Sequence, residues 1–324
     1  MGHRCETAEG FVGTIERALA NGWNKETVGS HIVRNNRIHH CEQNGIVGSL
    51  ECAFSRITGN EIHGIHVRRV FDGVEMAGIK FHGSVDVEIS DNHIYRTNCG
   101  IGLDWMTQGA RISRNLLHDN THPEPLFGDF LSEANHGPYL VDNNIMLSPH
   151  AVSICESHSG AFIHNLLGGR VTCVDRIARD VPWLEPHATA IKGIEPTRVG
   201  DDLCLNNHFT GGANLDCYKE LAPPGVREGN AFSSAEPACL VHKPDGAWAF
   251  SGNPISSCNK ATASPVNADR LNAAKVSPHP FESPDGTALR LDCDFHGTPR
   301  ISGHPQPGPF GSPVVSNQSI QVWP

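Results

Sequence analysis

The residues best suited to chemistry are Asp104 and Glu133, two carboxylic acids that each end a short apolar segment. The segments Gly100–Asp104 (GIGLD) and Asp129–Glu133 (DFLSE) share one frame with Gly78–His82 (GIKFH). If the three are neighbouring parallel strands, ~4.8 Å apart, equivalent carboxyl groups lie roughly 5 Å apart. Retaining glycosidases hold their two carboxyl groups about 5–5.5 Å apart, whereas inverting enzymes need ~6.5–9.5 Å to admit a water. The arrangement therefore favours a retaining glycosidase.

The two carboxyl groups suit different roles. Two carboxylates this close cannot easily both ionise, so one pKa should rise, as a general acid requires. Glu133 has the longer side chain and can reach a leaving group, which makes it the candidate general acid/base. Asp104 is shorter and held in a strand, which suits a nucleophile. The competing interpretation is two surface acids on a polar ladder.

Neighbouring residues are candidates for substrate binding. Trp105 offers a sugar ring an apolar face, although packing between coils or against the C-terminal extension would use the same ring. Lys80 and His82 could bond sugar hydroxyls or tune the nucleophile, or could simply be solvated. His136, three residues after Glu133, could orient the acid or occupy a turn.

A repeat explains how these residues could be brought together. The pattern apolar-x-x-Asn-x-apolar occurs seven times, with Asn at positions 36, 60, 92, 115, 144, 165 and 207. The intervals of 24, 32, 23, 29, 21 and 42 residues describe a period near 21–24 with insertions and one doubled interval. Short strands stacked in parallel register produce such a period. The leucine ladder of leucine-rich repeats and the 3.6-residue period of helical repeats are absent. We therefore predict an all-β fold, a right-handed parallel β-helix.

Asn suits the bends of such a solenoid, because it tolerates left-handed backbone geometry and can bond its own turn. Stacked copies of Asn could also bond one another along the helix axis. Asp104 lies 12 residues after Asn92, and Glu133 lies 18 after Asn115. The surplus of six fits an insertion within Thr121–Gly128, a loop with two prolines.

The chain divides into three parts by composition. Residues 29–215 carry the repeat and are expected to form the β-helix. Residues 216–324 are rich in Pro, Gly and Ser and are expected to form a loop-rich extension that packs along it. Residues 1–28 are expected to be an N-terminal cap. In it, Ile15–Gly22 forms a short helix over the open end of the first coil, since an uncovered end exposes unpaired strand edges.

Composition argues against several classes of protein. A net charge of −10 without a block of Lys or Arg disfavours nucleic acid or an anionic membrane as partner. No stretch reaches the ~18 apolar residues of a membrane span, and the start MGHRCETAEGF has no apolar signal segment, so a cytoplasmic protein is expected. The 11 Cys residues are irregularly spaced, without C-x-x-C, and predict neither a zinc module nor a disulfide framework. We expect no metal and no cofactor, and a homo-oligomer is compatible with the sequence.

At these residues the sequence closely resembles glycoside hydrolase family 120, the β-helix β-xylosidases. The resemblance rests on segments 29–36 (GSHIVRNN), 45–48 (GIVG), 77–82 (AGIKFH), 103–105 (LDW) and 133–144 (EANHGPYLVDNN), and on 280–296 and 307–310. It runs from about residue 21 to 310 and is weakest at 215–275. It implies a retaining mechanism on xylo-oligosaccharides, with Asp104 as nucleophile and Glu133 as general acid/base. The positions that line the family's pocket region are matched by Lys80, His82, Trp105, His136 and His187.

Three departures from the family's pattern favour an alternative function. Gly102 stands where family members usually carry a bulky aromatic residue, and Ser132 replaces a usual aliphatic residue. The chain is also expected to start inside the family's length, without its N-terminal coils. The alternative is a catalytically impaired β-helix that binds carbohydrate or packs into an oligomer. A lyase or epimerase acting on uronates would need a basic, often Ca²⁺-assisted site, which the acidic pair and the net charge disfavour.

Overall fold

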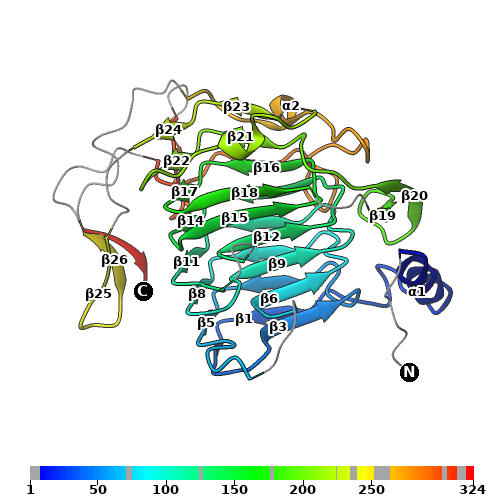
Figure 1. The fold of residues 1–324 in the computed structure, drawn as a ribbon, viewed down its shortest axis with the longest axis horizontal. Helices are drawn as coiled ribbons and strands as arrows, with labels where there is room; N and C mark the ends of the chain where they lie inside the picture. The colour runs from blue at the N-terminus through cyan, green and yellow to red at the C-terminus, as the bar shows by residue number, and fades with distance from the viewer. Residues whose placement is uncertain are drawn as a thin grey trace.

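In a computed structural model of the chain, stacked short strands form a parallel β-helix (Figure 1). The structure describes residues 8–70, 75–123, 127–175, 179–223, 225–233, 239–251, 263–300, 305–311 and 319–324. The predicted cap at 1–28 and the predicted insertion in Thr121–Gly128 therefore lie partly outside the described residues. No helix in the described ranges is long and apolar enough to cross a membrane.

Three parallel sheets form the walls. Each of the first six coils has one strand in each sheet, and the last two described coils have strands in sheets A and B. Sheet A contains, in order, β1 (Ile32–Arg34), β4 (Arg56–Thr58), β7 (Glu88–Ser90), β10 (Arg111–Ser113), β13 (Tyr139–Asp142), β16 (Gly160–Ile163), β21 (Leu203–Leu205) and β23 (Val226–Glu228). Sheet B contains β2 (Arg37–His39), β5 (Glu61–His63), β8 (His93–Tyr95), β11 (Leu116–His118), β14 (Ile145–Met146), β17 (Leu166–Leu167), β22 (His208–Phe209) and β24 (Ala231–Phe232). Sheet C contains β3 (Asn44–Ser49), β6 (Ala77–His82), β9 (Ile101–Asp104), β12 (Phe130–Glu133), β15 (His150–Cys155) and β18 (Arg170–Val174). This confirms the predicted all-β solenoid.

A ladder of Asn side chains runs along the turn between sheets A and B. Each amide nitrogen donates to the amide oxygen of the next Asn at 2.9–3.1 Å, through Asn36, Asn60, Asn92, Asn115, Asn144, Asn165, Asn207 and Asn230. The predicted bonding between stacked copies is therefore present. The left-handed residue of the bend is the one before the ladder Asn, as at Asp91 (φ 55°) and Arg114 (φ 54°). The ladder Asn instead satisfies the backbone of the neighbouring coils.

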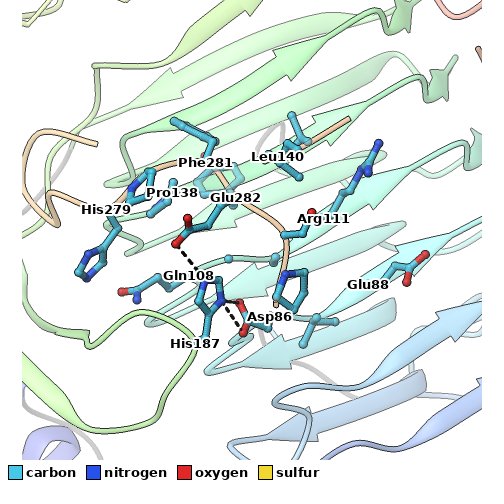
Figure 2. Close-up of a pocket in the computed structure, with 18 of the residues that line it drawn as sticks. Asp86, Glu88, Gln108, Arg111, Pro138, Leu140, His187, His279, Phe281 and Glu282 are labelled. Atoms are coloured by element: carbon cyan, nitrogen blue, oxygen red, sulfur yellow. Dashed lines mark hydrogen bonds and ion pairs between the residues drawn. The ribbon is translucent and has the colours of Figure 1, made fainter. Parts of the chain in front are cut away.

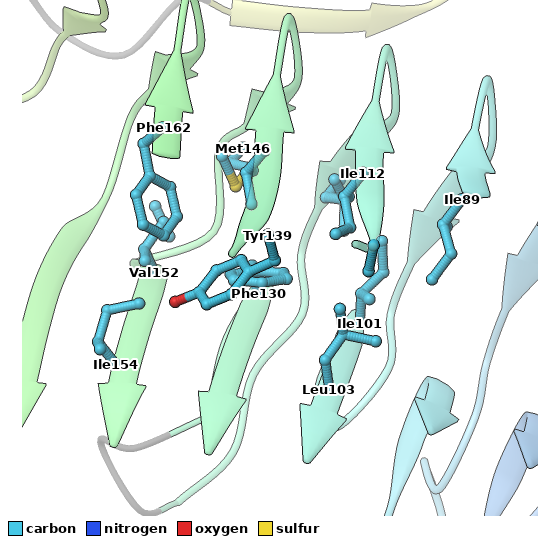
Figure 3. Close-up of a cluster of buried hydrophobic side chains, with 14 of the residues drawn as sticks. Ile89, Ile101, Leu103, Ile112, Phe130, Tyr139, Met146, Val152, Ile154 and Phe162 are labelled. Atoms are coloured by element: carbon cyan, nitrogen blue, oxygen red, sulfur yellow. The ribbon is translucent and has the colours of Figure 1, made fainter. Parts of the chain in front are cut away.

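The interior of the solenoid is filled by alternate residues of the strands (Figure 3). Ile101 and Leu103 of β9 point inward, as do Phe130 of β12 and Ile154 of β15, and all are almost fully buried. Because side chains alternate along a strand, the residues between them project from the outer face of sheet C. This alternation places Asp104 and Glu133 on that outer face.

The long interval between Asn165 and Asn207 is a single coil with an insertion, because these two Asn residues bond each other directly. The extra residues contribute the antiparallel hairpin of β19 (Asp180–Leu184) and β20 (Ile191–Pro196). The doubled interval therefore does not mark a skipped coil. The β-helix also continues beyond the predicted boundary at 215, since β23 and β24 add a further coil.

The described parts of the C-terminal extension lie along the β-helix. It contains the 3₁₀ turn η1 (Asp216–Tyr218), the helix α2 (Ala268–Leu271), and an antiparallel sheet of β25 (Cys239–His242), β26 (Trp248–Ser251) and β27 (Ile320–Trp323). Phe281 and Leu289 bury apolar surface against sheet A, and Phe250 and Phe310 do so against sheet B. The outer faces of both sheets are thereby covered over their central strands, while β1, β2 and β23 keep exposed residues.

The N-terminal helix α1 (Ala8–Ala20) starts earlier than predicted and packs beside the coils (Figure 1). Its Ile15 is buried among turn residues that follow strands of sheet C, including Met106 and Ala134, and against Val181 of β19. We expected it to cover the open end of the first coil. Instead the inward-facing Val33 of β1 and Ile38 of β2 are only partly buried, whereas Ile57 and Ile62 of the next coil are fully buried, so α1 does not cap that end.

Candidate active site

The register of sheet C places three polar residues in one row. His82 of β6 pairs with Asp104 of β9, and Asp104 pairs with Glu133 of β12. Adjacent parallel strands lie ~4.8 Å apart, so the two carboxylic residues are direct neighbours on one face. The register predicted from the sequence is therefore present.

Asp104 is surrounded by positive groups. Lys80 Nζ lies 2.9 Å from its Oδ2, and His82 Nε2 lies 3.4 Å from the same oxygen. Burial opposes ionisation, but Lys80 and His82 outweigh it and hold the pKa of the Asp104 carboxyl below its usual value. Its Oδ1 is buried and has no hydrogen-bond partner in the described part of the chain. The surroundings of Asp104 thus favour its ionised form, and its Oδ1 atom accepts no hydrogen bond from the described residues.

Glu133 differs from Asp104, because its surroundings favour the protonated form of its carboxyl group. Burial and the neighbouring Asp104 charge raise the pKa of its carboxyl, although Arg179 partly offsets them. Its side chain is 16% exposed, so it reaches solvent more than that of Asp104, which is 5% exposed. The row therefore holds an ionised carboxylate beside a carboxyl group that retains its proton more readily.

Arg179, which the sequence analysis did not identify, forms an ion pair with Glu133. Its NH2 group is 2.7 Å from Glu133 Oε1, and its Nε is 2.7 Å from Oε2 of the buried Glu156. Arg179 directly precedes β19 in the insertion, where no repeat predicts which residues meet the coils. The unusual length of the interval after Asn165 was the one available signal.

Trp105 lies beside the carboxylate pair, as its place after Asp104 requires. The ring of Phe11 from α1 lies 4.1 Å from its ring centroid, and the guanidinium of Arg179 lies 5.5 Å from it. Trp105 thus packs against α1, an element that we did not predict as its partner. The contacts leave Trp105 partly exposed.

His136 is buried and turned toward the hairpin. Its Nε2 lies 2.9 Å from the carbonyl oxygen of Val181, and its Nδ1 lies 3.0 Å from His158 Nε2. No hydrogen bond joins it to Glu133 in the described structure. His136 therefore anchors β19, the strand that directly follows Arg179.

His187 lies in a different pocket (Figure 2). Its Nδ1 is 2.9 Å from Asp86 Oδ2, and its Nε2 is 3.1 Å from Glu282 Oε1 of the C-terminal extension. That pocket lies over sheet A, and neither Asp104 nor Glu133 is among the described residues that line it. The structure therefore does not bring His187 to the carboxylate pair.

Gly102 and Ser132, the two departures from the family's pattern, have local explanations. Gly102 faces Lys80 in the neighbouring strand, and a Cβ at Gly102 would lie 3.1 Å from Lys80 Cδ. The glycine leaves room for the lysine to reach Asp104. Ser132 faces the interior, where its Oγ accepts a hydrogen bond of 2.9 Å from Asn135 Nδ2.

One group of side chains has the donor types of a metal site. Glu75, His82 and Asp104 each present a possible ligand atom, and these atoms lie within 4.8 Å of one another. Lys80 Nζ, however, lies 3.2 Å from Glu75 and 2.9 Å from Asp104. An ammonium group already supplies positive charge at that position, so the donors do not fit a metal ion there.

Comparisons with known proteins agree with this fold. The family model described as a right handed beta helix region matches residues 14–167, which supports the predicted handedness. Among solved structures, the chain is similar to XylC, described in complex with xylose, with a TM-score of 0.83 and 29% sequence identity. The match covers 98% of this chain and 55% of the XylC chain, so this chain spans about half the length of that protein. The likeness confirms the resemblance to glycoside hydrolase family 120, the family of XylC. No protein of curated function matches the sequence.

Proposed function

We propose that this protein is a retaining glycoside hydrolase with Asp104 as nucleophile and Glu133 as general acid/base. One observation carries the proposal: adjacent strands hold the two residues side by side in unlike charge surroundings. Lys80 and His82 favour an ionised Asp104, while burial and Asp104 itself favour a protonated Glu133. An ionised nucleophile beside a protonated acid is the starting state of a retaining glycosidase.

In the first step, Oδ1 of Asp104 attacks the anomeric carbon of the sugar. The bond between that carbon and the glycosidic oxygen breaks, and the proton of Glu133 passes to the departing oxygen. Asp104 becomes an uncharged ester, which removes the repulsion that had kept Glu133 protonated. Glu133 is therefore left as a carboxylate.

In the second step, Glu133 takes a proton from a water molecule whose oxygen attacks the same carbon. The bond between the sugar and Asp104 breaks, and Asp104 becomes a carboxylate again beside Lys80. Two displacements at one carbon leave the sugar with its original anomeric configuration. Both carboxyl groups return to their starting protonation states.

The substrate class is proposed from the likeness to XylC. We propose β-xylosides, in particular xylo-oligosaccharides. His82, with its side chain 19% exposed, is placed to bond a sugar hydroxyl beside Asp104, and the partly exposed Trp105 borders the same position. The Nζ atom of Lys80 already contacts Asp104 and Glu75, so we assign Lys80 to Asp104 and not to the substrate.

A carbohydrate-binding β-helix without turnover is the second candidate function. The observation that favours it is the contact between Phe11 and Trp105, because Phe11 occupies apolar surface of the ring that a sugar would otherwise use. Binding of xylobiose without hydrolysis of any xyloside would support this candidate.

The experiment is a screen of nitrophenyl glycosides with the parent chain, Asp104→Asn and Glu133→Gln. We expect β-xyloside hydrolysis in the parent, with NMR showing a first-formed product of retained configuration. Glu133→Gln should lose least activity on substrates whose leaving group needs no proton, whereas Asp104→Asn should lose activity on all. Equal loss on every leaving group in Glu133→Gln would contradict an acid role, and an inverted first product would contradict the covalent intermediate.

A further inference from the structure

The guanidinium group of Arg179 joins the proposed acid/base to a second carboxylate. It lies 2.7 Å from Glu133 and 2.7 Å from Glu156, whose side chain is only 1% exposed. Glu156 follows β15, one coil beyond Glu133. The planar guanidinium carries several donors in fixed directions and is always charged, which suits it to bridge two carboxylates.

Arg179 is fixed in place by the hairpin that follows it. The backbone N–H of Thr197 donates to the carbonyl oxygen of Arg179 at 2.7 Å, and His136 lies 2.9 Å from the carbonyl oxygen of Val181. The ring of Trp105 lies under the guanidinium at 5.5 Å. The charged group is therefore held at Glu133 before any substrate arrives.

Each of the two cations, Lys80 and Arg179, has a carboxylate partner in both states of the reaction. While Glu133 is protonated, Lys80 pairs with Asp104, and Arg179 pairs with Glu156. In the glycosyl-enzyme the negative charge moves from Asp104 to Glu133, and Arg179 already contacts Glu133. Lys80 then keeps Glu75, 3.2 Å away, as a carboxylate partner, and Arg179 contacts both Glu133 and Glu156.

We propose that Arg179 is a positioning residue that holds Glu133 as a carboxylate for the second step of hydrolysis, with Glu156 fixing the guanidinium. This inference rests on the proposed function. The charged groups that act on Glu133 are Asp104, Lys80 and Arg179, and only Asp104 favours its protonated form. A carboxylate stabilised in this way takes a proton from water without first reorganising its surroundings.

The test compares Arg179→Met, the double variant Arg179→Met with Glu156→Gln, and Glu156→Gln alone. Arg179→Met leaves the buried carboxylate of Glu156 without its guanidinium, which can prevent folding. The double variant removes both charges and keeps the test possible. Arg179→Lys retains a charge but cannot bridge both carboxylates with the same geometry.

In the double variant we expect the alkaline limb of kcat/KM to move to higher pH, because the group that lowers the pKa of Glu133 is gone. On aryl xylosides with good leaving groups, where the second step limits turnover, kcat should fall roughly 10- to 100-fold. Arg179→Lys should keep the alkaline limb near that of the parent. A loss of kcat with an unmoved alkaline limb, or no change in either quantity, would overturn the proposal.

A second readout separates this inference from the proposed function. Titration of the ¹³C-labelled Glu133 carboxyl by NMR needs no turnover. If the parent hydrolyses no xyloside, the proposed function fails on that result alone. The inference about Arg179 fails if Glu133 titrates at the same pH in the parent and in the double variant.

A separate observation concerns two cysteines at the far end of sheet C. Sγ of Cys173 in β18 and Sγ of Cys217 in η1 lie 2.9 Å apart, although 44 residues separate them in sequence. Uncharged carbon atoms rest ~3.5–4.0 Å apart, and sulfur is larger, so the two thiols are in unusually close contact. β18 is the last strand of sheet C, and η1 packs beside it.

We infer that Cys173 and Cys217 are a site of disulfide formation that fastens η1 to the end of sheet C. With oxidised glutathione as oxidant, the two thiols lose two protons and two electrons as an S–S bond forms, and the glutathione disulfide is reduced to two thiols. The cross-link would close a loop of 44 residues and so restrict the unfolded chain. It is independent of the proposed reaction.

The test equilibrates the whole chain in glutathione buffers of rising oxidised fraction, alkylates the remaining thiols and identifies linked peptides by mass spectrometry. We expect a linked pair of peptides containing Cys173 and Cys217, and a Tm several degrees higher than that of the reduced chain. Cys217→Ser should abolish both effects, while Cys239→Ser, at an exposed position, should retain them. If alkylation shows that both thiols remain reduced in the most oxidising buffer, or if they form disulfides with other cysteines, the inference is wrong.

Discussion

The ammonium group of Lys80 lies 2.9 Å from Oδ2 of Asp104, with side chains that are 3% and 5% exposed. Burial alone would favour the neutral form of each group, but each stabilises the charge of the other. The pair is therefore a buried charge pair in which removal of either partner changes the protonation of the other.

We predict that Lys80→Met moves the acidic limb of the pH–rate profile to higher pH. Lys80 lowers the pKa of Asp104, so its removal raises that pKa, and a larger share of this proposed nucleophile is protonated at a given acidic pH. The measurement is kcat/KM for an aryl xyloside across pH. Lys219→Met is the control, because Lys219 is a 66% exposed lysine that pairs with Asp216 at 2.9 Å. An unmoved acidic limb in Lys80→Met would contradict the role given to Lys80.

We predict that substitution of Gly102 acts through Lys80. A Cβ at this position would lie 3.1 Å from Lys80 Cδ, so Gly102→Ala should shift the lysine slightly and Gly102→Leu should displace it from Asp104. Activity should therefore fall in the order glycine, alanine, leucine, by ~10-fold or more for leucine. The measurement is kcat/KM together with the acidic limb, which should move in the same direction as in Lys80→Met. Equal activity of all three forms would show that the close approach at Gly102 is not needed.

We predict that the Asn ladder contributes strongly to stability at its centre and weakly at its end. Asn115 is fully buried and donates to Ile89 and Asn144, so Asn115→Ala should lower the free energy of unfolding by about 3 kcal/mol. Asn36 is exposed at the first coil, and Asn36→Ala should cost less than about 1 kcal/mol. Urea unfolding of the two variants measures the difference. Similar costs would mean that the ladder bonds do not depend on burial.

We predict that Asp202 makes stability fall as pH rises. Burial raises the pKa of this carboxyl to about 8, compared with ~3.9 for an unperturbed Asp. Between these values the folded state binds more protons than the unfolded state, so the free energy of unfolding declines with increasing pH. Asp202→Asn cannot ionise and should show a flatter dependence of Tm on pH from about 5 to 8. Asp216→Asn changes an exposed carboxylate and serves as control. A parent Tm that rises across this range would contradict the prediction.

The register of the site could be predicted because the repeat constrains it. Asn92 and Asn115 mark equivalent points on two coils, and the strands that carry Asp104 and Glu133 end in the same frame. The last coil was missed for a local reason. Asn230 continues the ladder, but Arg227 stands where the pattern requires an apolar residue.

Arg179 could not be predicted from the sequence. It contacts Glu133 across 46 residues of chain and lies in an insertion to which the repeat assigns no position. The same holds for Phe11, whose contact with Trp105 depends on where α1 docks. Periodicity predicts neighbours along the solenoid axis, whereas these contacts come from segments that leave the solenoid and return to its side.

Because of the Asn ladder, the number of residues in a coil does not determine how far that coil rises along the axis of the solenoid. Coils of 21 and of 42 residues both advance the chain by one Asn–Asn bond, so added residues project sideways and do not move neighbouring strands apart. Loops around the proposed site can therefore be lengthened, exchanged or grafted while the distance between the carboxyl groups of Asp104 and Glu133 stays constant. For protein engineering, this makes the loop corners of the scaffold the place to vary what borders the carboxylate pair, with the pair itself left intact.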